Sequence, residues 1–437
     1  MTTDIRHTCP RLEESYTEIR HPSGLRILVS YKDFSAAYGI LGVHYGSRDR
    51  LCGGAHPMGI AHFLEHKMFE KSDGTSWEDD FSALGAEVNA YTSDDCTAYL
   101  FSATDHIPEA IEALLRMVNS LEITPASVAR ERSIIAEEIR MNTDDPWESC
   151  YAAMLRGLYP PVRKGGNPVR EEICGSEASI RRITPAVLRA AHTRFYHPAN
   201  MVLAVSGRVS TEEVRAAVDR VLCDKPAEFS LTASRRRISA FPTAYKAYTE
   251  ARMDTAKPLF SIGIKHPAPP TEPMALLRLE RLMTLLSEML FSRSGDFYSD
   301  LFERSVISPG ISYGSSVGRP ALGGTGEGYA YLYLSGEGDD PRAVFAALED
   351  YIAAVKREGL DPAAFERARR TMYADYICGF DSTEGIASSL MTTAMDGIGL
   401  YDLSDVDATL TLAEAKELLD TLFAPSQYTL SVVLPAE

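Results

Sequence analysis

Ala61-His62-Phe63-Leu64-Glu65-His66 is the stretch that decides the interpretation of this chain. On a helix, residues four apart share one face, so the imidazoles of His62 and His66 can bind the same metal ion. Glu65 lies next to that face, close enough to take a proton from a water on the metal. The apolar residues in and after this stretch predict a buried helix, whose ionisable groups need partners. The ten histidines of the chain allow such a pattern by chance, so a third ligand is required.

A second helical segment offers carboxylates for that third ligand. One stripe at the 3.6-residue period contains Val128, Glu131, Ile134, Ile135 and Glu138. Its three apolar members predict that the stripe faces inward, and buried carboxylates are costly unless something compensates them. We expect Glu138 to be the ligand and Glu131 to orient a ligand or the bound water, whereas Glu137, about 100° round the helix, faces solvent. The alternative is that Glu131 and Glu138 pair with arginines.

Hydrophobic periodicity indicates a mixture of strands and helices around these segments. The pattern predicts strands at residues 24–30, 37–44, 86–92 and 96–102, and helices at 57–70, 77–84, 107–120 and 125–141. Because the two types do not alternate strictly, an α+β fold is predicted rather than a nucleotide-binding parallel sheet.

The two halves of the chain repeat each other. Residues 195–205 resemble residues 423–432, and the Thr-Pro-Ala at 124–126 resembles the Asp-Pro-Ala at 361–363. We therefore predict two homologous domains, each a mixed or antiparallel sheet packed with helices. The metal-bearing domain spans residues 1–223, a linker spans 224–243, and a metal-free copy spans 244–437. In that copy, Ala368 and Asp375 stand at the positions of Glu131 and Glu138.

The charge balance bears on partners. The 437 residues include 44 Lys and Arg against 61 Asp and Glu, which gives a net charge of −17. An acidic chain does not attract phosphate backbones, so a peptide or a small molecule is a better expectation than nucleic acid.

Cysteines and hydropathy bear on the compartment. The seven cysteines are scattered and odd in number, and they contain no CxxC pair, which favours thiols in a reducing compartment. The start of the chain lacks an apolar signal-like region, and four charged residues interrupt the most apolar helical stretch, residues 274–290. We expect a cytoplasmic protein with no membrane partner.

Several of these motifs together resemble the pitrilysin/insulysin family of zinc peptidases, which includes the mitochondrial processing peptidases. They are the HFLEH at 62–66, which has the inverzincin order, the GAEVNAYT at 85–92, the downstream ERxxIxxE at 131–138 and the internal repeat. The resemblance implies zinc held by His62, His66 and Glu138, with Glu65 as general base and Glu131 in support.

The same resemblance implies a substrate site and a partner. The strand matching Asn89, Ala90, Tyr91 and Thr92 is an edge strand to which a peptide adds itself, although it could also be an ordinary strand and turn. At 48.0 kDa the chain resembles the short members, which form half of a clamshell chamber built from two subunits.

One departure concerns the substrate grip. Phe302 stands where the family has a substrate-gripping arginine, and the spacing to Tyr313 is stretched. Arg304 could substitute, but a heterodimer with a metal-free homologous subunit that supplies the arginine is the simpler hypothesis. A homodimer is the alternative.

The sequence therefore predicts a zinc-dependent metalloendopeptidase that hydrolyses short or unfolded peptides. A non-catalytic peptide-binding or assembly subunit of a heterodimeric peptidase is the alternative, and a metallohydrolase acting on something other than peptides is a third possibility.

Overall fold

The computed structural model describes residues 4–52, 56–71, 73–222, 229–231, 241–320 and 328–436. These residues form two compact units. Unit 1 contains residues 1–137, 172–234 and 376–401, and unit 2 contains residues 138–171, 235–375 and 402–437. Most of the predicted linker, residues 224–243, lies outside the described residues, so the predicted domain boundaries stay a prediction.

Unit 1 is built on a seven-stranded sheet in the order β1-β2-β3-β7-β4-β6-β5. Its strands are β1 (Asp4–Cys9), β2 (Glu14–Arg20), β3 (Arg26–Tyr31), β4 (Ala37–Val43), β5 (Ala86–Thr92), β6 (Thr97–Ala103) and β7 (Met201–Gly207). Only β3 and β7 pair in parallel, and the other pairs are antiparallel. The centre of the sheet, β4 and β7, is buried along its whole length.

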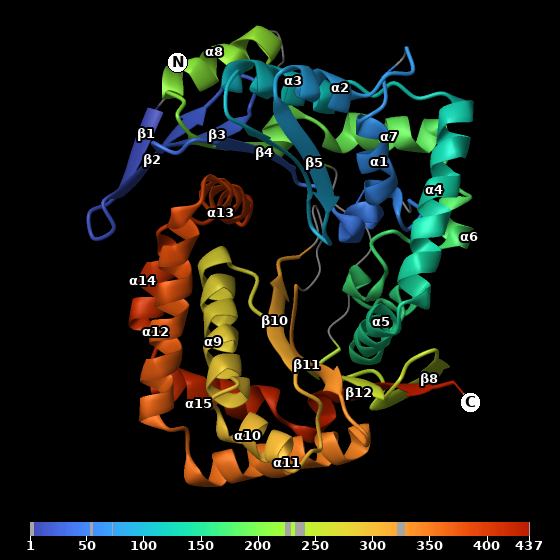
Figure 1. Ribbon diagram of the computed structural model, residues 1–437, viewed down its shortest axis with the longest axis vertical. Coiled ribbons are helices and arrows are strands. Elements are labelled where there is room, and N and C mark those ends of the chain that lie inside the picture. Colours follow the sequence, from blue (N-terminus) through green and yellow to red (C-terminus); the bar gives the residue numbers. More distant parts are fainter. Residues whose placement is uncertain are drawn as a thin grey trace. The chain divides into compact units, whose positions relative to one another are not determined.

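Helices surround this sheet (Figure 1). They are α1 (Ile60–Met68), α2 (Trp77–Ala83), α3 (Ile107–Asn119), α4 (Pro125–Asp144), α6 (Glu177–Ile180), α7 (Pro185–Phe195), α8 (Thr211–Leu222) and α13 (Thr383–Met395); α4 continues into unit 2. The strands and helices predicted between residues 24 and 141 are confirmed, with boundaries that shift by at most a few residues.

Unit 2 repeats the central part of this topology. Its five-stranded sheet has the order β10-β11-β9-β12-β8, in which only β12 and β8 pair in parallel. The strands are β8 (Tyr248–Met253), β9 (Leu259–Lys265), β10 (Ser312–Gly318), β11 (Tyr329–Glu337) and β12 (Tyr428–Pro435). They correspond in order and direction to β3, β4, β5, β6 and β7 of unit 1. The predicted α+β fold with duplicated domains is confirmed.

The helices of unit 2 are α5 (Pro146–Leu158), α9 (Pro273–Phe291), α10 (Asp296–Glu303), α11 (Pro341–Glu358), α12 (Pro362–Cys378), α14 (Asp402–Thr409) and α15 (Leu412–Leu422); α12 ends in unit 1. The prolines that suggested the repeat, Pro125 and Pro362, both open long helices, a position that suits proline because its missing N–H is not needed there. No helix in the described ranges combines the length and the apolar composition needed to cross a bilayer.

Each half of the sequence gives one helix to the unit built mainly from the other half. From the second half, α13 packs on β4 and β7 of unit 1, where Met391 and Met395 lie against Gly42 (red helix in Figure 1). From the first half, α5 packs on β9 and β12 of unit 2, where Met154 lies against Gly263. Neither sheet is covered by its own half of the sequence alone.

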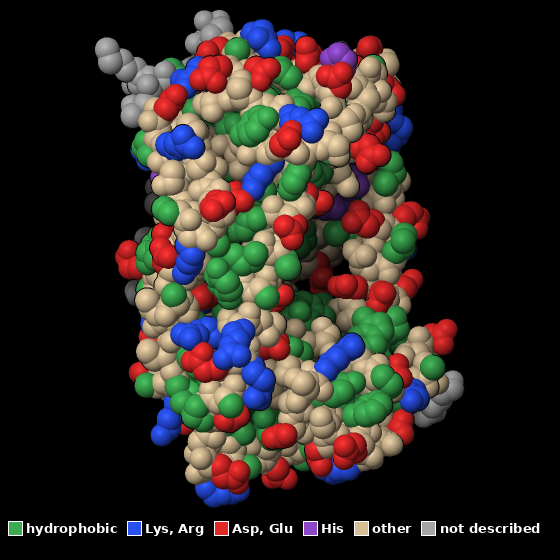
Figure 2. Space-filling view, turned by 60° about the vertical axis from the view of Figure 1, so that its left-hand side comes forward, with side chains coloured by type: hydrophobic (Ala, Val, Ile, Leu, Met, Phe, Trp, Pro, Cys, Tyr) green, Lys and Arg blue, Asp and Glu red, His purple; other side chains and the backbone are tan. Residues whose placement is uncertain are grey.

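On the face shown in Figure 2, acidic and basic side chains are interspersed with hydrophobic ones. The six cysteines among the described residues form no disulfide.

Candidate metal centre

The HFLEH stretch forms the buried helix α1, as predicted. The helix begins after Gly59, whose φ of 82° is the left-handed conformation that favours glycine. All its residues are buried except His66, which is half-buried. His62 is 8% exposed, Glu65 is 9% exposed and Lys67 is 1% exposed, so three ionisable side chains of this helix are buried. Burial on this scale requires compensating partners.

The two histidines of α1 lie side by side. The ring centroids of His62 and His66 are 4.6 Å apart, and the ring planes are inclined at 61°. This is the arrangement that a four-residue spacing produces on a helix, and it brings two imidazoles to one place.

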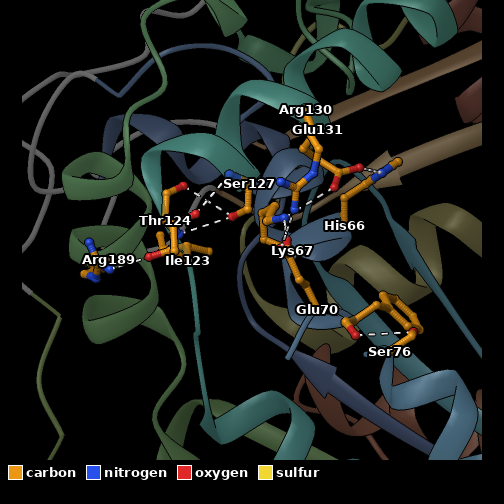
Figure 3. A network of polar contacts seen from close by, with 11 residues as sticks. His66, Lys67, Glu70, Ser76, Ile123, Thr124, Ser127, Arg130, Glu131 and Arg189 are labelled. Carbon is orange, nitrogen blue, oxygen red and sulfur yellow. Dashed lines mark hydrogen bonds and ion pairs between the residues drawn. The ribbon is translucent and has the colours of Figure 1, made fainter. Parts of the chain in front are cut away.

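His66 is held by a carboxylate from α4 (Figure 3). Nδ1 of His66 lies 3.0 Å from Oε1 of Glu131. A carboxylate on Nδ1 fixes the orientation of the ring and makes Nε2 the nitrogen that could hold a metal ion, which is the usual support for a metal-binding histidine.

Lys67 also contacts Glu131, and no sequence pattern predicted this contact. Its side chain is only 1% exposed, and its Nζ contacts Glu70 and, at 3.4 Å, Oε2 of Glu131. Burial lowers the pKa of Lys67, and the charge of Glu131 opposes that change. Burial alone would raise the pKa of Glu131, but the hydrogen bond to His66 and the charge of Lys67 hold it below its usual value. Glu131 is therefore a carboxylate kept ionised by its neighbours.

Glu65, the predicted base, accepts a hydrogen bond from β5. The hydroxyl of Thr92 donates to Oε2 of Glu65 over 2.7 Å. Two buried tyrosines, Tyr99 and Tyr196, share a hydrogen bond of 2.8 Å between their hydroxyls. Burial raises the pKa of each, and the charge of Glu65 adds to the effect. Both phenols therefore stay neutral beside Glu65.

Strand β5, which contains the predicted substrate-binding residues, is the edge strand of the unit 1 sheet and lies beyond β6. Ser93 N–H donates to Cys96 O at the hairpin, and hydrogen-bonded and non-bonded pairs alternate along an antiparallel ladder. The backbone N–H and C=O groups of Thr92 and Ala90 therefore point away from β6, toward the open edge. The Ala90 N–H donates to the side-chain oxygen of Asn89, 2.8 Å away. Tyr91 is exposed.

Glu138 lies seven residues beyond Glu131 on the unbroken helix α4, almost two turns along the same side. It is half-buried and is the first residue of unit 2. Glu137 is exposed, as predicted.

One part of the predicted stripe is wrong, because Ile134 is 57% exposed. The buried apolar positions of α4 are Val128, Ile135 and Ile139. Ile134 lies about 120° round the helix from Val128, beyond Glu131 and Glu138, which is why it reaches solvent.

A thiol that the sequence analysis did not select also lies at this site. Sγ of Cys174 is 3.8 Å from Nε2 of His62. Cys174 is about 110 residues away from His62 in the sequence, so no local spacing could have indicated the contact.

The donors gathered here suit zinc. Zinc takes imidazole nitrogen, carboxylate oxygen and thiolate sulfur as ligands. The two imidazoles of α1 present such donors together, and the carboxylate on Nδ1 of His66 is the support that a metal-binding imidazole normally has.

Unit 2 offers no comparable set. Within the part of unit 2 that the structure describes, no cluster of potential metal ligands occurs by itself. Ala368 is buried and Asp375 is exposed at the positions that correspond to Glu131 and Glu138.

The position of the expected substrate-gripping arginine, residue 302, and its neighbours Arg304 and Tyr313 lie in unit 2. Phe302 is exposed, and Arg304 pairs with Asp300 on the same helix over 2.7 Å. The hydroxyl of Tyr313, on the outer strand β10, donates to Glu288 over 2.7 Å.

Known families match both halves of the chain. A family described as insulinase (peptidase family M16) matches residues 30–159, and one described as peptidase M16 inactive domain matches residues 182–372. The uncharacterized zinc protease YmfH of Bacillus subtilis is 29% identical over 435 residues, which are 97% of this chain and 98% of that protein. The uncharacterized zinc protease ML0855 of Mycobacterium leprae is 28% identical over 377 residues, 84% of this chain and 80% of that protein.

Solved structures show the same relationship. The crystal structure of an M16-like peptidase from Alicyclobacillus acidocaldarius superimposes with a TM-score of 0.88 at 28% identity, covering 98% of this chain and all of that one. A protease from Helicobacter pylori shares the fold, with a TM-score of 0.82 at 18% identity over 97% of this chain and 100% of that one. The matched families, the relatives and the duplicated fold agree, and this chain belongs to peptidase family M16, the insulinase or pitrilysin family.

Proposed function

We propose that this chain is a zinc-dependent metalloendopeptidase that hydrolyses short or unfolded peptides. The observation that carries the proposal is the arrangement on α1, where His62 and His66 lie together and Glu131 supports His66. Two of its relatives are named zinc proteases, which supports the choice of metal and reaction.

Each residue has a specific role in this proposal. His62, His66 and Glu138 hold the zinc ion, and Glu131 keeps the His66 ring oriented. Zinc, when bound, polarises the scissile carbonyl and makes a water molecule acidic enough to lose its proton near neutral pH. Glu65 accepts that proton and passes it to the leaving amine, and the Thr92 hydroxyl holds the carboxylate in place.

The edge strand β5 provides the substrate site. A peptide in extended conformation pairs with the outward backbone groups of Ala90 and Thr92, with Asn89 and Tyr91 on either side of them. Backbone pairing places few demands on the peptide sequence, which suits an enzyme for short or unfolded peptides. The Asn89 side chain, now bonded to the Ala90 N–H, would give way to the peptide carbonyl.

The experiment uses the purified chain, alone and combined with its homologous partner subunit, and a peptide blocked at both ends. We expect about one zinc per chain, and cleavage at internal bonds by the complete enzyme, identified by mass spectrometry. Glu65→Gln should keep the zinc and lower kcat by about 10³-fold or more, because it removes the proton acceptor. His66→Ala should lose both zinc and activity. Full activity in Glu65→Gln would refute the mechanism.

The alternative is a peptide-binding subunit without catalysis of its own. The match of residues 182–372 to an inactive domain family favours it for the second half only, where Ala368 and Asp375 replace the carboxylates. Zinc bound without any peptide cleavage, in the presence of the correct partner, would favour this alternative.

We also propose a dimeric enzyme, with a metal-free homologous subunit as the partner and a homodimer as the second choice. Arg304 is paired with Asp300, and Phe302 takes the place of the gripping arginine, so a second subunit is the simplest source of that arginine. Full activity from the monomeric chain alone would refute the dimer.

The proposed compartment is the cytoplasm. The thiols of the six described cysteines, none of them in a disulfide, support a reducing environment. Fractionation of cells that express the native protein, with antibody detection, tests this; recovery with secreted or periplasmic proteins would refute it.

A further inference from the structure

Cys174 lies where a metal ligand would lie. Its sulfur is 3.8 Å from Nε2 of His62, a side chain that the proposed function assigns to the zinc ion. Across a tetrahedral zinc with ordinary bond lengths of about 2.3 Å to sulfur and about 2.0–2.1 Å to nitrogen, the two ligand atoms stand roughly 3.5–3.6 Å apart. The observed separation is close to that value.

The backbone holds this sulfur in place. An added Cβ on Gly59, with φ of 82°, would come within 2.3 Å of the Cys174 carbonyl oxygen. An added Cβ on Gly175, with φ of 79°, would come within 2.7 Å of the Met58 carbonyl oxygen. Both glycines lack the side chain that would separate the two segments, so the Cys174 turn packs directly on the start of α1.

The next residues fix the other side of the turn. Ser176 and Ser179 exchange side-chain to backbone hydrogen bonds of 2.8 Å and 3.2 Å at the start of α6. The backbone that carries the thiol is therefore held by main-chain packing on one side and by a helix cap on the other.

We propose that Cys174 is a further protein ligand of the metal ion held by His62 and His66, so that the resting site has sulfur as well as nitrogen and oxygen donors. This inference rests on the proposed zinc site. A thiolate is a ligand that zinc favours, and the donor is already beside its imidazole partner.

The consequence for the enzyme is a closed resting site. Zinc sites with four protein ligands are closed, whereas catalytic sites keep one position for water. With His62, His66, Glu138 and Cys174 all bound, water can enter only when the thiol leaves. Cys174 and the attacking water would compete for one position.

Cobalt in place of zinc tests the inference directly. The whole chain is stripped with a chelator and reloaded with one equivalent of Co²⁺, whose near-ultraviolet charge-transfer absorption reports a bound sulfur. Three proteins are compared: wild type, Cys174→Ser, and Cys9→Ser as the matched control, since Cys9 is the other half-buried thiol. We expect the absorption in wild type and in the control, and its loss in Cys174→Ser with cobalt still bound.

Alkylation of the wild-type chain provides a measurement that needs no variant. Iodoacetamide should modify Cys174 at least tenfold more slowly in the loaded chain than in the metal-free chain, while Cys9 reacts at the same rate in both. Peptide mass spectrometry separates the two thiols.

The outcomes distinguish this inference from the proposed function. If one cobalt binds but the charge-transfer absorption and the protection of Cys174 are both absent, the inference is overturned. Cys174 then makes only a thiol to imidazole contact with His62, and the proposed zinc site is unaffected. Failure of the wild-type chain to bind either cobalt or zinc overturns the proposed function, and this inference with it.

Discussion

At the scale of single residues, Thr92 connects the edge strand β5 to Glu65, the proposed general base. Its hydroxyl donates to Glu65, so a residue of the proposed substrate strand also orients the carboxylate that is proposed to receive the proton. Because misorientation of a base affects the chemical step more than binding, the two can be separated kinetically.

We predict that Thr92→Val lowers kcat about tenfold or more with little change in KM and with full zinc content. Thr92→Ser, which restores a hydroxyl at this position, should recover most of the activity. Steady-state kinetics and metal analysis of both variants check this. Wild-type kcat in Thr92→Val would exclude a role for the hydrogen bond, and a loss in Thr92→Ser as large as that in Thr92→Val would show that a hydroxyl alone is not sufficient.

A second residue-scale prediction concerns Glu131 and the buried Lys67. Glu131→Gln removes the carboxylate from His66, so zinc affinity should fall about 10–100-fold. The same change leaves Lys67 with a weaker partner and should cost about 1–3 kcal/mol of stability. Competition with a zinc-binding dye and denaturant unfolding measure the two effects.

The double variant Lys67→Met with Glu131→Gln separates them. Removing the buried charge should recover part of the lost stability, whereas zinc affinity should stay low because His66 still lacks its carboxylate. Glu137→Gln, on the exposed side of the same helix, is the control and should change neither quantity. Unchanged zinc affinity in Glu131→Gln would exclude a role for Glu131 in positioning His66.

The metal site could be predicted only as far as helical periodicity reaches. His62, Glu65 and His66 share one helix, and Glu131 and Glu138 share another, so their relation is local. Cys174, Lys67 and the Thr92 hydroxyl enter through contacts between distant segments, which no spacing encodes. The prediction that Ile134 is buried is wrong because this isoleucine lies at the edge of the stripe and not in its buried centre.

At the scale of elements, strand β5 contacts helix α1, which carries the proposed catalytic residues, and forms the edge of the sheet. The Ala90 N–H points away from β6, so a proline there removes no hydrogen bond from the ladder. It does remove a donor that an added peptide strand would use.

We predict that Ala90→Pro lowers kcat/KM at least about 100-fold while the far-ultraviolet circular dichroism and the zinc content stay at wild-type levels. Ala90→Ser keeps the N–H and is the matched control. Activity of Ala90→Pro equal to that of the control would show that the peptide does not add to this edge.

The elements themselves were largely predictable, since long amphipathic segments and alternating strands carry strong local signals. The sheet on which each helix packs was not predictable from the sequence. The burial patterns of α5 and α13 indicate that each helix has an apolar face, but they do not say which sheet that face covers. The exchange of these helices therefore emerged only in three dimensions.

At the scale of the whole molecule, that exchange ties the two sequence halves together. The apolar face of the unit 1 sheet includes Tyr38, Ile40 and Leu28, and it packs on Leu390, Met391 and Met395 of α13. Without α13 this face would be left exposed to water, at a cost of about 25 cal/mol for each Å² of apolar surface.

We predict that residues 1–243, expressed alone, aggregate or bind a hydrophobic dye strongly. Co-expression with residues 244–437 should restore a soluble complex with the zinc content of the intact chain. Size-exclusion chromatography and metal analysis test this, and a soluble, cooperatively unfolding 1–243 fragment would contradict it.

The helix exchange also delays the folding of unit 1 while the chain is being synthesised. Roughly 190 residues separate Gly207, the end of the last unit 1 strand, from Met395, the end of α13. At ribosomal speeds of about 5–20 residues per second, the first sheet waits on the order of 10–40 s for its missing cover. During that interval its apolar face is available to chaperones, and a ribosome that stalls before residue 383 leaves behind a fragment that cannot finish folding.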